Sequence, residues 1–214
     1  MVFFVLSQIN GAKVGIIILF AYFCGKQIRN FDADMEHPLA QFDFCPRCGA
    51  HGFAVHNVKS KQCPACGFTY YFNPSAATVA VIVNSHNELL VCRRAKDPAR
   101  GTLDLPGGFI DSFETAEEGV SREVREETGL EVTRTDYLFS LPNLYPYSGF
   151  TVHTLDLFFR CRVADDSRYR AMDDAAELFF LPWEKINPRE FGLASIRRGI
   201  ERLLTQQGLH ISGE

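Results

Sequence analysis

Residues 108–130, GFIDSFETAEEGVSREVREETGL, decide the fold of this chain. Within them, Thr115 followed by Glu118 is the signature of a helix capping box, and Gly129 stands where a C-terminal helix cap belongs. The stretch therefore predicts one strongly marked helix over residues 115–128.

Three glutamates of this helix, Glu123, Glu126 and Glu127, are spaced so that their carboxylates share one helical face. On a helical wheel Glu127 falls close to Val120 and Val124, which are expected to face the core. Clustered, partly buried carboxylates repel one another and take up protons unless cations neutralise them. Oxygen ligands of this kind suit Mg²⁺ or Mn²⁺. The alternative interpretation is a solvated acidic face, which is common on helices rich in charged residues.

Two further features favour the metal site. Arg122 precedes Glu126 by about one helical turn and can hold that carboxylate in one orientation. The pair Gly107-Gly108 allows the backbone to approach bound ions closely and to offer a carbonyl oxygen, a role that we assign to Gly107.

The same stretch resembles the box of the Nudix hydrolase family, G-x5-E-x7-R-E-U-x-E-E-x-G-U, in which U is apolar. Every fixed position is matched, by Gly108, Glu114, Arg122, Glu123, Val124, Glu126, Glu127, Gly129 and Leu130. The resemblance implies an α/β fold, namely an α/β/α sandwich with a mixed sheet, and cleavage of a nucleoside diphosphate linked to another group. It also implies that the three glutamates bind catalytic divalent cations, that Arg122 orients a carboxylate and that Glu114 supports the loop. Which glutamate activates water varies within the family, so that role stays open.

Four cysteines form two matched Cys-x-x-Cys-Gly motifs within residues 43–72: Cys45, Cys48, Cys63 and Cys66. Two thiolates three positions apart on a tight turn can face one ion, and two such turns complete a tetrahedron. The pattern predicts a zinc ribbon with a structural Zn²⁺, because four protein thiolates leave no open coordination position. The alternatives are redox motifs or buried thiols, but a thioredoxin-like motif would occur singly at a strand–helix junction.

A zinc ribbon ahead of a Nudix box is similar to the arrangement of the NADH pyrophosphatase subfamily. That subfamily carries a motif S-Q-P-W-P-F-P-x-S, and at the same offset this chain reads SLPNLYPYS. The resemblance implies that Ser140, Tyr145 and Ser148 contact the nucleotide and that the ring of Phe109 stacks on its base. Four residues depart from the motif: Leu141, Asn143, Leu144 and Tyr145, of which Tyr145 replaces a phenylalanine. The substrate is therefore left open between NADH or NAD⁺, another dinucleotide or ADP-ribose, and the NAD cap of an RNA 5′ end.

The segment DDAAELFFLPWEKI, residues 173–186, resembles the late part of the family, where an acidic residue completes the metal site. By that resemblance Asp174 is the first candidate and Glu177 the second, with a solvated turn as the alternative. Four basic residues either gather near the phosphates or form a basic surface loop: Arg93, Arg94, Lys96 and Arg100.

Three parts are expected along the chain: a hydrophobic leader over residues 1–34, the zinc ribbon over 43–72 and the Nudix hydrolase domain over 75–206. We interpret the leader as a start-site artefact ahead of Met35, with a membrane anchor as the main alternative.

Apolar runs predict the main elements of the hydrolase domain. Those at 78–83 and 89–92 predict a hairpin around a polar turn, and those at 137–140 and 150–163 predict strands. The helical spacing of apolar residues between 193 and 203 predicts an amphipathic C-terminal helix packed on the sheet.

Composition narrows the class of function. A net charge of −4 argues against broad, charge-driven binding to nucleic acid or to an anionic membrane. The odd number of cysteines, 7, argues against a disulfide framework and favours a reducing, cytoplasmic location. We expect an enzyme with a nucleotide substrate or a capped RNA end, and a homodimer is common in the family that it resembles. The alternatives are a nucleotide-binding sensor and a zinc-ribbon module for nucleic acid, and a membrane partner is expected only if residues 1–34 are an anchor.

Overall fold

The computed structural model describes residues 5–9, 12–16, 37–147, 149–172 and 175–208. The chain divides into two compact units, Met1–His37 and Pro38–Glu214. In the first unit, strands β1 (Val5–Ile9) and β2 (Ala12–Ile16) pair antiparallel. The rest of the leader expected over residues 1–34 lies outside the described residues. None of the helices among the described residues is long and apolar enough to cross a membrane.

The second unit begins with a small antiparallel sheet of three strands. These strands are β3 (Ala54–Asn57), β4 (Ser60–Gln62) and β5 (Thr69–Tyr71). One cysteine pair precedes β3 and the other lies in the loop between β4 and β5. A cluster of only three buried residues, Cys45, Phe53 and Cys63, forms the core of this part.

The larger part of this unit combines two sheets of three strands with two helices. Its elements are β6 (Ser75–Ile82), β7 (Glu88–Arg94), β8 (Leu103–Asp104), α1 (Ala116–Thr128), β9 (Val132–Tyr147), β10 (Phe150–Val163), β11 (Ala175–Pro182), η1 (Trp183–Lys185), η2 (Pro188–Glu190) and α2 (Ala194–Gln206). The strand orders are β6-β10-β9 and β11-β7-β8. β6 and β10 run parallel, whereas the other paired strands run antiparallel, so the mixed sheet that we expected is confirmed.

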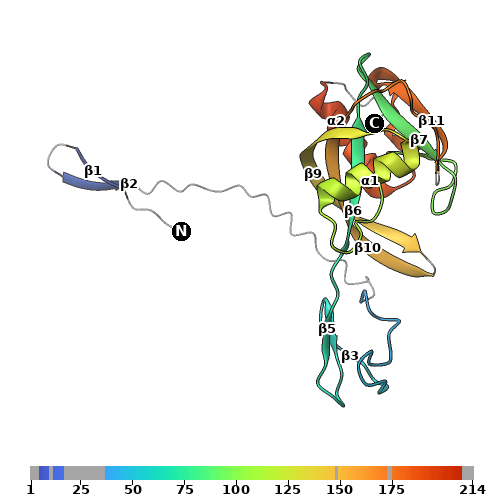
Figure 1. The fold of residues 1–214 in the computed structure, drawn as a ribbon. Helices are drawn as coiled ribbons and strands as arrows, with labels where there is room; N and C mark the ends of the chain where they lie inside the picture. The colour runs from blue at the N-terminus through green and yellow to red at the C-terminus, as the bar shows by residue number, and fades with distance from the viewer. Residues whose placement is uncertain (1–4, 10–11, 17–36, 148, 173–174, 209–214) are drawn as a thin grey trace. The chain divides into compact units, whose positions relative to one another are not determined.

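The two faces of the sheets are covered by different helices, because side chains alternate along each strand. Val79 and Val81 of β6 belong to a buried cluster with the apolar face of α2. Ala80 and Ile82 belong to a second cluster with Val120 and Val124 of α1. Figure 1 shows α1 lying in front of β6. The α/β/α sandwich is therefore confirmed.

Helix α1 begins and ends where the sequence indicates, and α2 covers the apolar spacing that predicted a C-terminal helix. The hydroxyl of Thr115 accepts the backbone N–H of Glu118, the Glu118 carboxylate accepts the N–H of Thr115, and Gly129 ends α1 in the left-handed conformation. In α2, Gly199 faces the ring of Phe158, and a Cβ at this position would collide with that ring. The glycine therefore lets α2 approach β10 closely.

Two expectations about strands are corrected. Residues 78–83 and 89–92 form strands that do not pair as a hairpin, since β6 pairs with β10 and β7 with β8 and β11. A single bridge between Val83 and Leu89 joins them before they diverge into different sheets. The strand expected over 137–140 continues through the SLPNLYPYS motif as part of β9. Its prolines are accommodated because β9 lies at the edge of its sheet, where a missing backbone donor is tolerated.

Candidate active site and cysteine cluster

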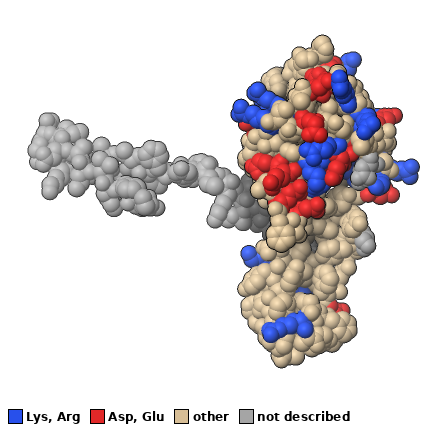
Figure 2. Space-filling model, viewed as in Figure 1, with Lys and Arg blue, Asp and Glu red and all other residues tan. Residues whose placement is uncertain are grey.

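One cavity of about 360 Å³ brings together residues from both sheets and both helices. Glu123, Glu126 and Glu127 of α1 line it, together with Gly107 and Gly108 of the preceding loop. Figure 2 shows acidic side chains gathered around basic ones on the face that carries α1. The three carboxylates of the sequence motif therefore share a cavity of the size that small-molecule sites have.

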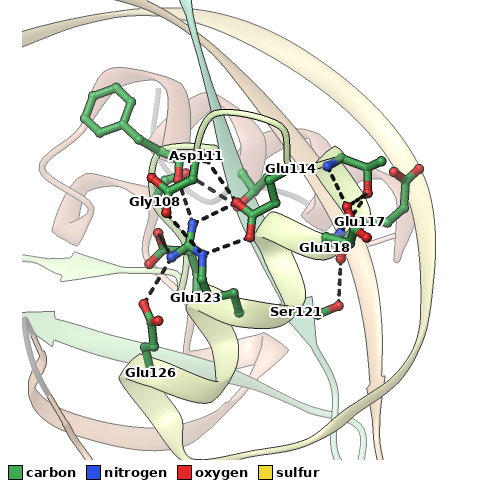
Figure 3. Close-up of polar contacts among 12 residues, drawn as sticks. Gly108, Asp111, Glu114, Glu117, Glu118, Ser121, Glu123 and Glu126 are labelled. Carbon is green, nitrogen blue, oxygen red and sulfur yellow. Dashed lines mark hydrogen bonds and ion pairs between the residues drawn. The ribbon is translucent and has the colours of Figure 1, made fainter.

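Arg122 ties the acidic residues of the motif together. Its guanidinium donates to both oxygens of Glu114 at 2.9 and 3.0 Å, to Glu123 at 2.9 Å and to Glu126 at 3.0 Å. A further bond of 3.0 Å reaches the carbonyl of Phe109, which fixes the loop to the helix. In Figure 3, Glu114 of the loop and Glu123 and Glu126 of α1 lie close together, on the side of the helix that faces the loop.

The loop before the motif is fixed from two sides. The N–H of Gly107 donates to the carboxylate of Glu127 at 3.0 Å, and the Gly108 carbonyl accepts from Thr78 N–H at 2.8 Å. Gly107 has a φ of +151°, and a Cβ there would collide with the Thr78 carbonyl. Only glycine fits this approach of the loop to β6. The role of the Gly107 carbonyl as a metal ligand stays a prediction.

Burial and ion pairing act in opposite directions on these carboxyl groups. Burial raises the pKa of Glu123 above the usual value of a glutamate, although Arg122 opposes the shift. Hydrogen bonds from Arg122 hold the pKa of Glu114 below its usual range. The bond to Glu114 is in turn the main reason that the pKa of Arg122 is raised. Glu114 therefore serves as the permanent counter-ion of Arg122, while Glu123 lies where an added cation would offset the cost of its burial.

The three glutamates line the cavity without meeting at one point. Among the described residues, only the four cysteines hold three or more ligand atoms within 4.8 Å of one another. Arg122 draws Glu123 and Glu126 toward itself, and the Gly107 amide draws Glu127. The oxygen-only donor set fits a hard divalent cation, which would compete with these bonds for the carboxylates.

The residues expected at the substrate end are only partly brought together. Phe109 and Tyr145 line the cavity, and their rings meet edge to face with centroids 6.0 Å apart. Ser140 is not among the lining residues, and Ser148 lies outside the described residues.

Of the two late acidic candidates, the structure describes only Glu177, and it does not join the glutamates. Asp174 lies outside the described residues. Glu177 lies on β11, forms an ion pair of 3.0 Å with Arg93 and does not line the cavity. The two residues are paired across β11 and β7, and both side chains are exposed. The geometry therefore gives no support to Glu177 as a metal ligand.

Of the four basic residues, Arg94 lines the cavity, where it donates to the buried carboxylate of Asp104 at 2.5 Å. Arg94 also contacts the hydroxyl of Tyr145 at 3.5 Å and therefore supports that ring.

Sequence reasoning gave no role in the site to several buried polar residues that line the cavity, among them Asn143, Thr154 and Asp156. Their alternation along strands could have placed them on one face. Which face borders the cavity follows only from the pairing of β9 with β10, in which Asn143 lies opposite Thr154.

The four cysteines of the small sheet form one cluster. Their sulfur atoms lie within 4.8 Å of one another, with Cys45 to Cys66 at 3.8 Å and Cys48 to Cys63 at 3.7 Å. A tetrahedron with Zn–S bonds of about 2.3 Å requires sulfurs about 3.8 Å apart, so the cluster has the dimensions of a zinc site. Backbone N–H groups, first that of Cys66, lower the pKa of Cys63 to about 7, which favours the thiolate form that binds metal.

Comparison with known proteins agrees with this geometry. The model of the NUDIX domain family matches residues 73–203, more than half of the chain. The chain is 33% identical over 112 residues to the NAD-capped RNA hydrolase NudC of Vibrio vulnificus, covering 52% of this chain and 42% of that protein. It is 35% identical over 115 residues to the ADP-ribose pyrophosphatase of Methanocaldococcus jannaschii, covering 53% of this chain and 64% of that protein.

Among solved structures, a NUDIX hydrolase from Nitrosomonas europaea is similar in fold, with a TM-score of 0.59 and 21% identity, covering 79% of this chain and 97% of that one. The match to NudC of Vibrio vulnificus spans less than half the length of that relative. The family model and the box residues around one cavity confirm the resemblance drawn from the sequence. The chain belongs to the NUDIX domain family.

Proposed function

We propose that this protein is a metal-dependent hydrolase that cleaves the diphosphate bond of a nucleoside diphosphate derivative, with NADH, NAD⁺ or a related dinucleotide as the substrate class. The observation that carries the proposal is a single cavity lined both by the three box glutamates and by the rings of Phe109 and Tyr145. A nucleotide presents a diphosphate and a flat base, and these two sets of side chains suit one each.

Each residue has a defined part in this proposal. Glu123, Glu126 and Glu127 hold Mg²⁺ or Mn²⁺, and Arg122 keeps the first two oriented through its hydrogen bonds. Bound divalent ions offset the charge of the diphosphate oxygens and make water a stronger nucleophile. The ring of Phe109 meets that of Tyr145 at a right angle and remains 43% exposed, so part of it is available to stack on a base.

The cysteine cluster has a separate, structural role in the proposal. Four thiolates at these distances fill the tetrahedron of a Zn²⁺ ion and leave no position for substrate. The buried core of this part is small, so the metal would supply much of its stability.

The substrate is tested directly by measuring release of phosphate-containing products, with Mg²⁺ or Mn²⁺. The panel contains NADH, NAD⁺, ADP-ribose, diadenosine polyphosphates and NAD-capped RNA, because the relatives are hydrolases of NAD-capped RNA and of ADP-ribose. Cleavage of NADH to NMNH and AMP would support the dinucleotide class.

Glu127→Gln is expected to abolish turnover and leave the fold intact, because it removes one charged oxygen ligand. Glu117→Gln is the matched control, since Glu117 lies on the same helix but does not line the cavity. Turnover by Glu127→Gln at the wild-type rate would remove this residue from the mechanism. Binding of nucleotides without cleavage by the wild type would identify a sensor instead.

A further inference from the structure

The charges of this chain are divided unequally between the two helices. Helix α1 carries five glutamates and two arginines, whereas α2 carries three arginines and one glutamate. The two helices pack on opposite faces of the sheets. The net charge of −4 therefore describes the whole chain and does not exclude an anionic partner on the side that carries α2.

On that side, a row of four arginines begins beside the cavity: Arg198, Arg202, Arg160 and Arg162. Arg198 of α2 donates to the backbone carbonyl of Pro142, the residue that precedes Asn143 of the cavity lining. Burial raises the pKa of Asp156, another lining residue, and the nearby charge of Arg198 opposes this shift. The first arginine of the row therefore lies at the rim of the cavity.

The row continues from the helix to the strands. The guanidinium of Arg202 lies 4.3 Å from the centre of the Phe139 ring. Phe139 lies opposite Phe158 in the register of β9 with β10. Arg160 and Arg162 follow Phe158 on the same face of β10, because side chains alternate along a strand. The four arginines therefore share one surface that runs away from the cavity.

The charges of this row are available to a partner. Arg160, Arg162 and Arg202 are exposed, and Arg198 is half-buried. Within the described ranges of the chain, none of the four forms an ion pair with a carboxylate. Arginines elsewhere do, as in the pairs Arg125 with Glu131, Arg134 with Asp136 and Arg168 with Asp165. Asp136, which lies opposite Arg160, is thus already held by its own arginine.

A row of like charges fits a chain of regularly spaced anions. Six residues of β10 separate Asp156 at the cavity from Arg162, a span of about 20 Å. Guanidinium groups bind phosphates through paired N–H bonds. A single-stranded polynucleotide offers one phosphate per residue and can be joined to a nucleotide in the cavity, which an acidic peptide cannot. Because the row begins at the rim, the polynucleotide is the occupant that the geometry favours.

We propose that Arg198, Arg202, Arg160 and Arg162 bind the phosphodiester chain of a single-stranded RNA whose 5′-terminal nucleotide lies in the cavity. This inference rests on the proposed function for the nucleotide and adds the surface along which the rest of the chain leaves the site. A chain that left over α1 would instead meet the five glutamates of that helix.

Binding without turnover tests the row. Fluorescence anisotropy, in the absence of Mg²⁺ and Mn²⁺, measures the affinity for an NAD-capped single-stranded RNA of about ten nucleotides, long enough to cover the row. The fluorophore is attached at the 3′ end. Four phosphate contacts predict that the logarithm of the association constant falls with the logarithm of the salt concentration with a slope of about −3.

Arg160→Gln/Arg162→Gln removes two of these contacts. We expect it to weaken binding by about tenfold or more at low salt and to make the salt slope shallower by about 1.4. Arg125→Gln/Arg170→Gln is the matched control, since it removes two exposed arginines from α1 and from the segment beside its C-terminus. The control should bind as the wild type does, and both melting temperatures should stay close to wild type because the side chains are exposed.

Wild-type affinity and salt slope in Arg160→Gln/Arg162→Gln, or an equal loss in the control, would overturn the assignment of the row. A polyglutamate peptide that binds through the same two arginines as tightly as the RNA would also overturn it and would indicate an acidic protein partner. Failure of the proposed function looks different, because it appears as absence of turnover on the whole panel. RNA binding through these arginines without any turnover would keep this inference and lose the hydrolase.

Discussion

The most direct test of the site geometry is Gly108→Ala, which adds one methyl group beside the carboxylate of Glu123. An ideal Cβ at Gly108 would lie 2.5 Å from Oε1, 2.6 Å from Cδ and 2.8 Å from Oε2 of Glu123. Carbon–oxygen contacts are ordinarily about 3.4 Å long, so the carboxylate must move by about 0.9 Å. Its ion pair with Arg122, at 2.9 Å, is disturbed by the same movement.

The expected cost falls on activity and not on folding. Mg²⁺ demands near-ideal octahedral geometry, and a displacement of about 1 Å in a catalytic group reduces rates by about 100-fold. We therefore expect kcat/KM for the preferred substrate to fall by about 100-fold in steady-state assays with Mg²⁺. The melting temperature should change little, because the group that yields is the end of a flexible side chain.

Two other glycines provide the comparison. Gly119 lies within α1, and its replacement by alanine places a Cβ 3.1 Å from Oε2 of Glu114. Gly119→Ala should retain activity, since alanine favours a helix. Gly107→Ala should lower the melting temperature, because its Cβ would meet the backbone of Thr78. Wild-type kcat/KM in Gly108→Ala would refute the view that the position of Glu123 is narrowly fixed.

Three further changes test other parts of the structure. Cys48→Ser should lose zinc, measured by plasma mass spectrometry, and lower the melting temperature more than kcat; retention of zinc and melting temperature would contradict the ribbon assignment. Burial raises the pKa of Glu123 above its ordinary value of 4.5, so the folded, metal-free protein binds this proton more readily than the unfolded chain. The free energy of unfolding therefore falls as the pH rises from 4.5 through the raised pKa of the folded state. Glu123→Gln should therefore melt higher than wild type at neutral pH without metal and gain less from added Mn²⁺; a lower melting point would show that the ion pair with Arg122 outweighs burial. Gly199→Ala should lower the free energy of unfolding by about 1–3 kcal/mol in urea titrations, because the new methyl group overpacks Phe158; an unchanged midpoint would mean that α2 can shift freely.

The features predictable from the sequence are those with a local cause. The bounds of α1 follow from the capping box at Thr115 and from Gly129, which act within a few residues of the helix. The cysteine cluster follows from spacing along two short turns. The α/β/α arrangement came from resemblance to a family, and alternating apolar residues then agree with it.

The features that escaped prediction depend on contacts between distant strands. The sequence shows two adjacent apolar runs but not that β6 leaves its neighbour to pair with β10. In the sequence, Asn143 is only a residue that departs from a motif. The register between β9 and β10 places it opposite Thr154 in the lining of the cavity. The prolines of β9 argue locally against a strand, and only its place at a sheet edge makes them acceptable.

Different elements carry two parts of the cavity lining: the glutamates lie on α1, whereas the buried polar residues Asn143, Thr154 and Asp156 lie on β9 and β10. A substitution on one set leaves the backbone that holds the other set unchanged, because the helices pack on opposite faces of the sheets. Under the proposed function, we therefore expect substitutions in β9 to change the choice of substrate before they change the hydrolytic chemistry. Such separation makes this scaffold readily evolvable, and it gives an engineer a short list of positions at which to begin.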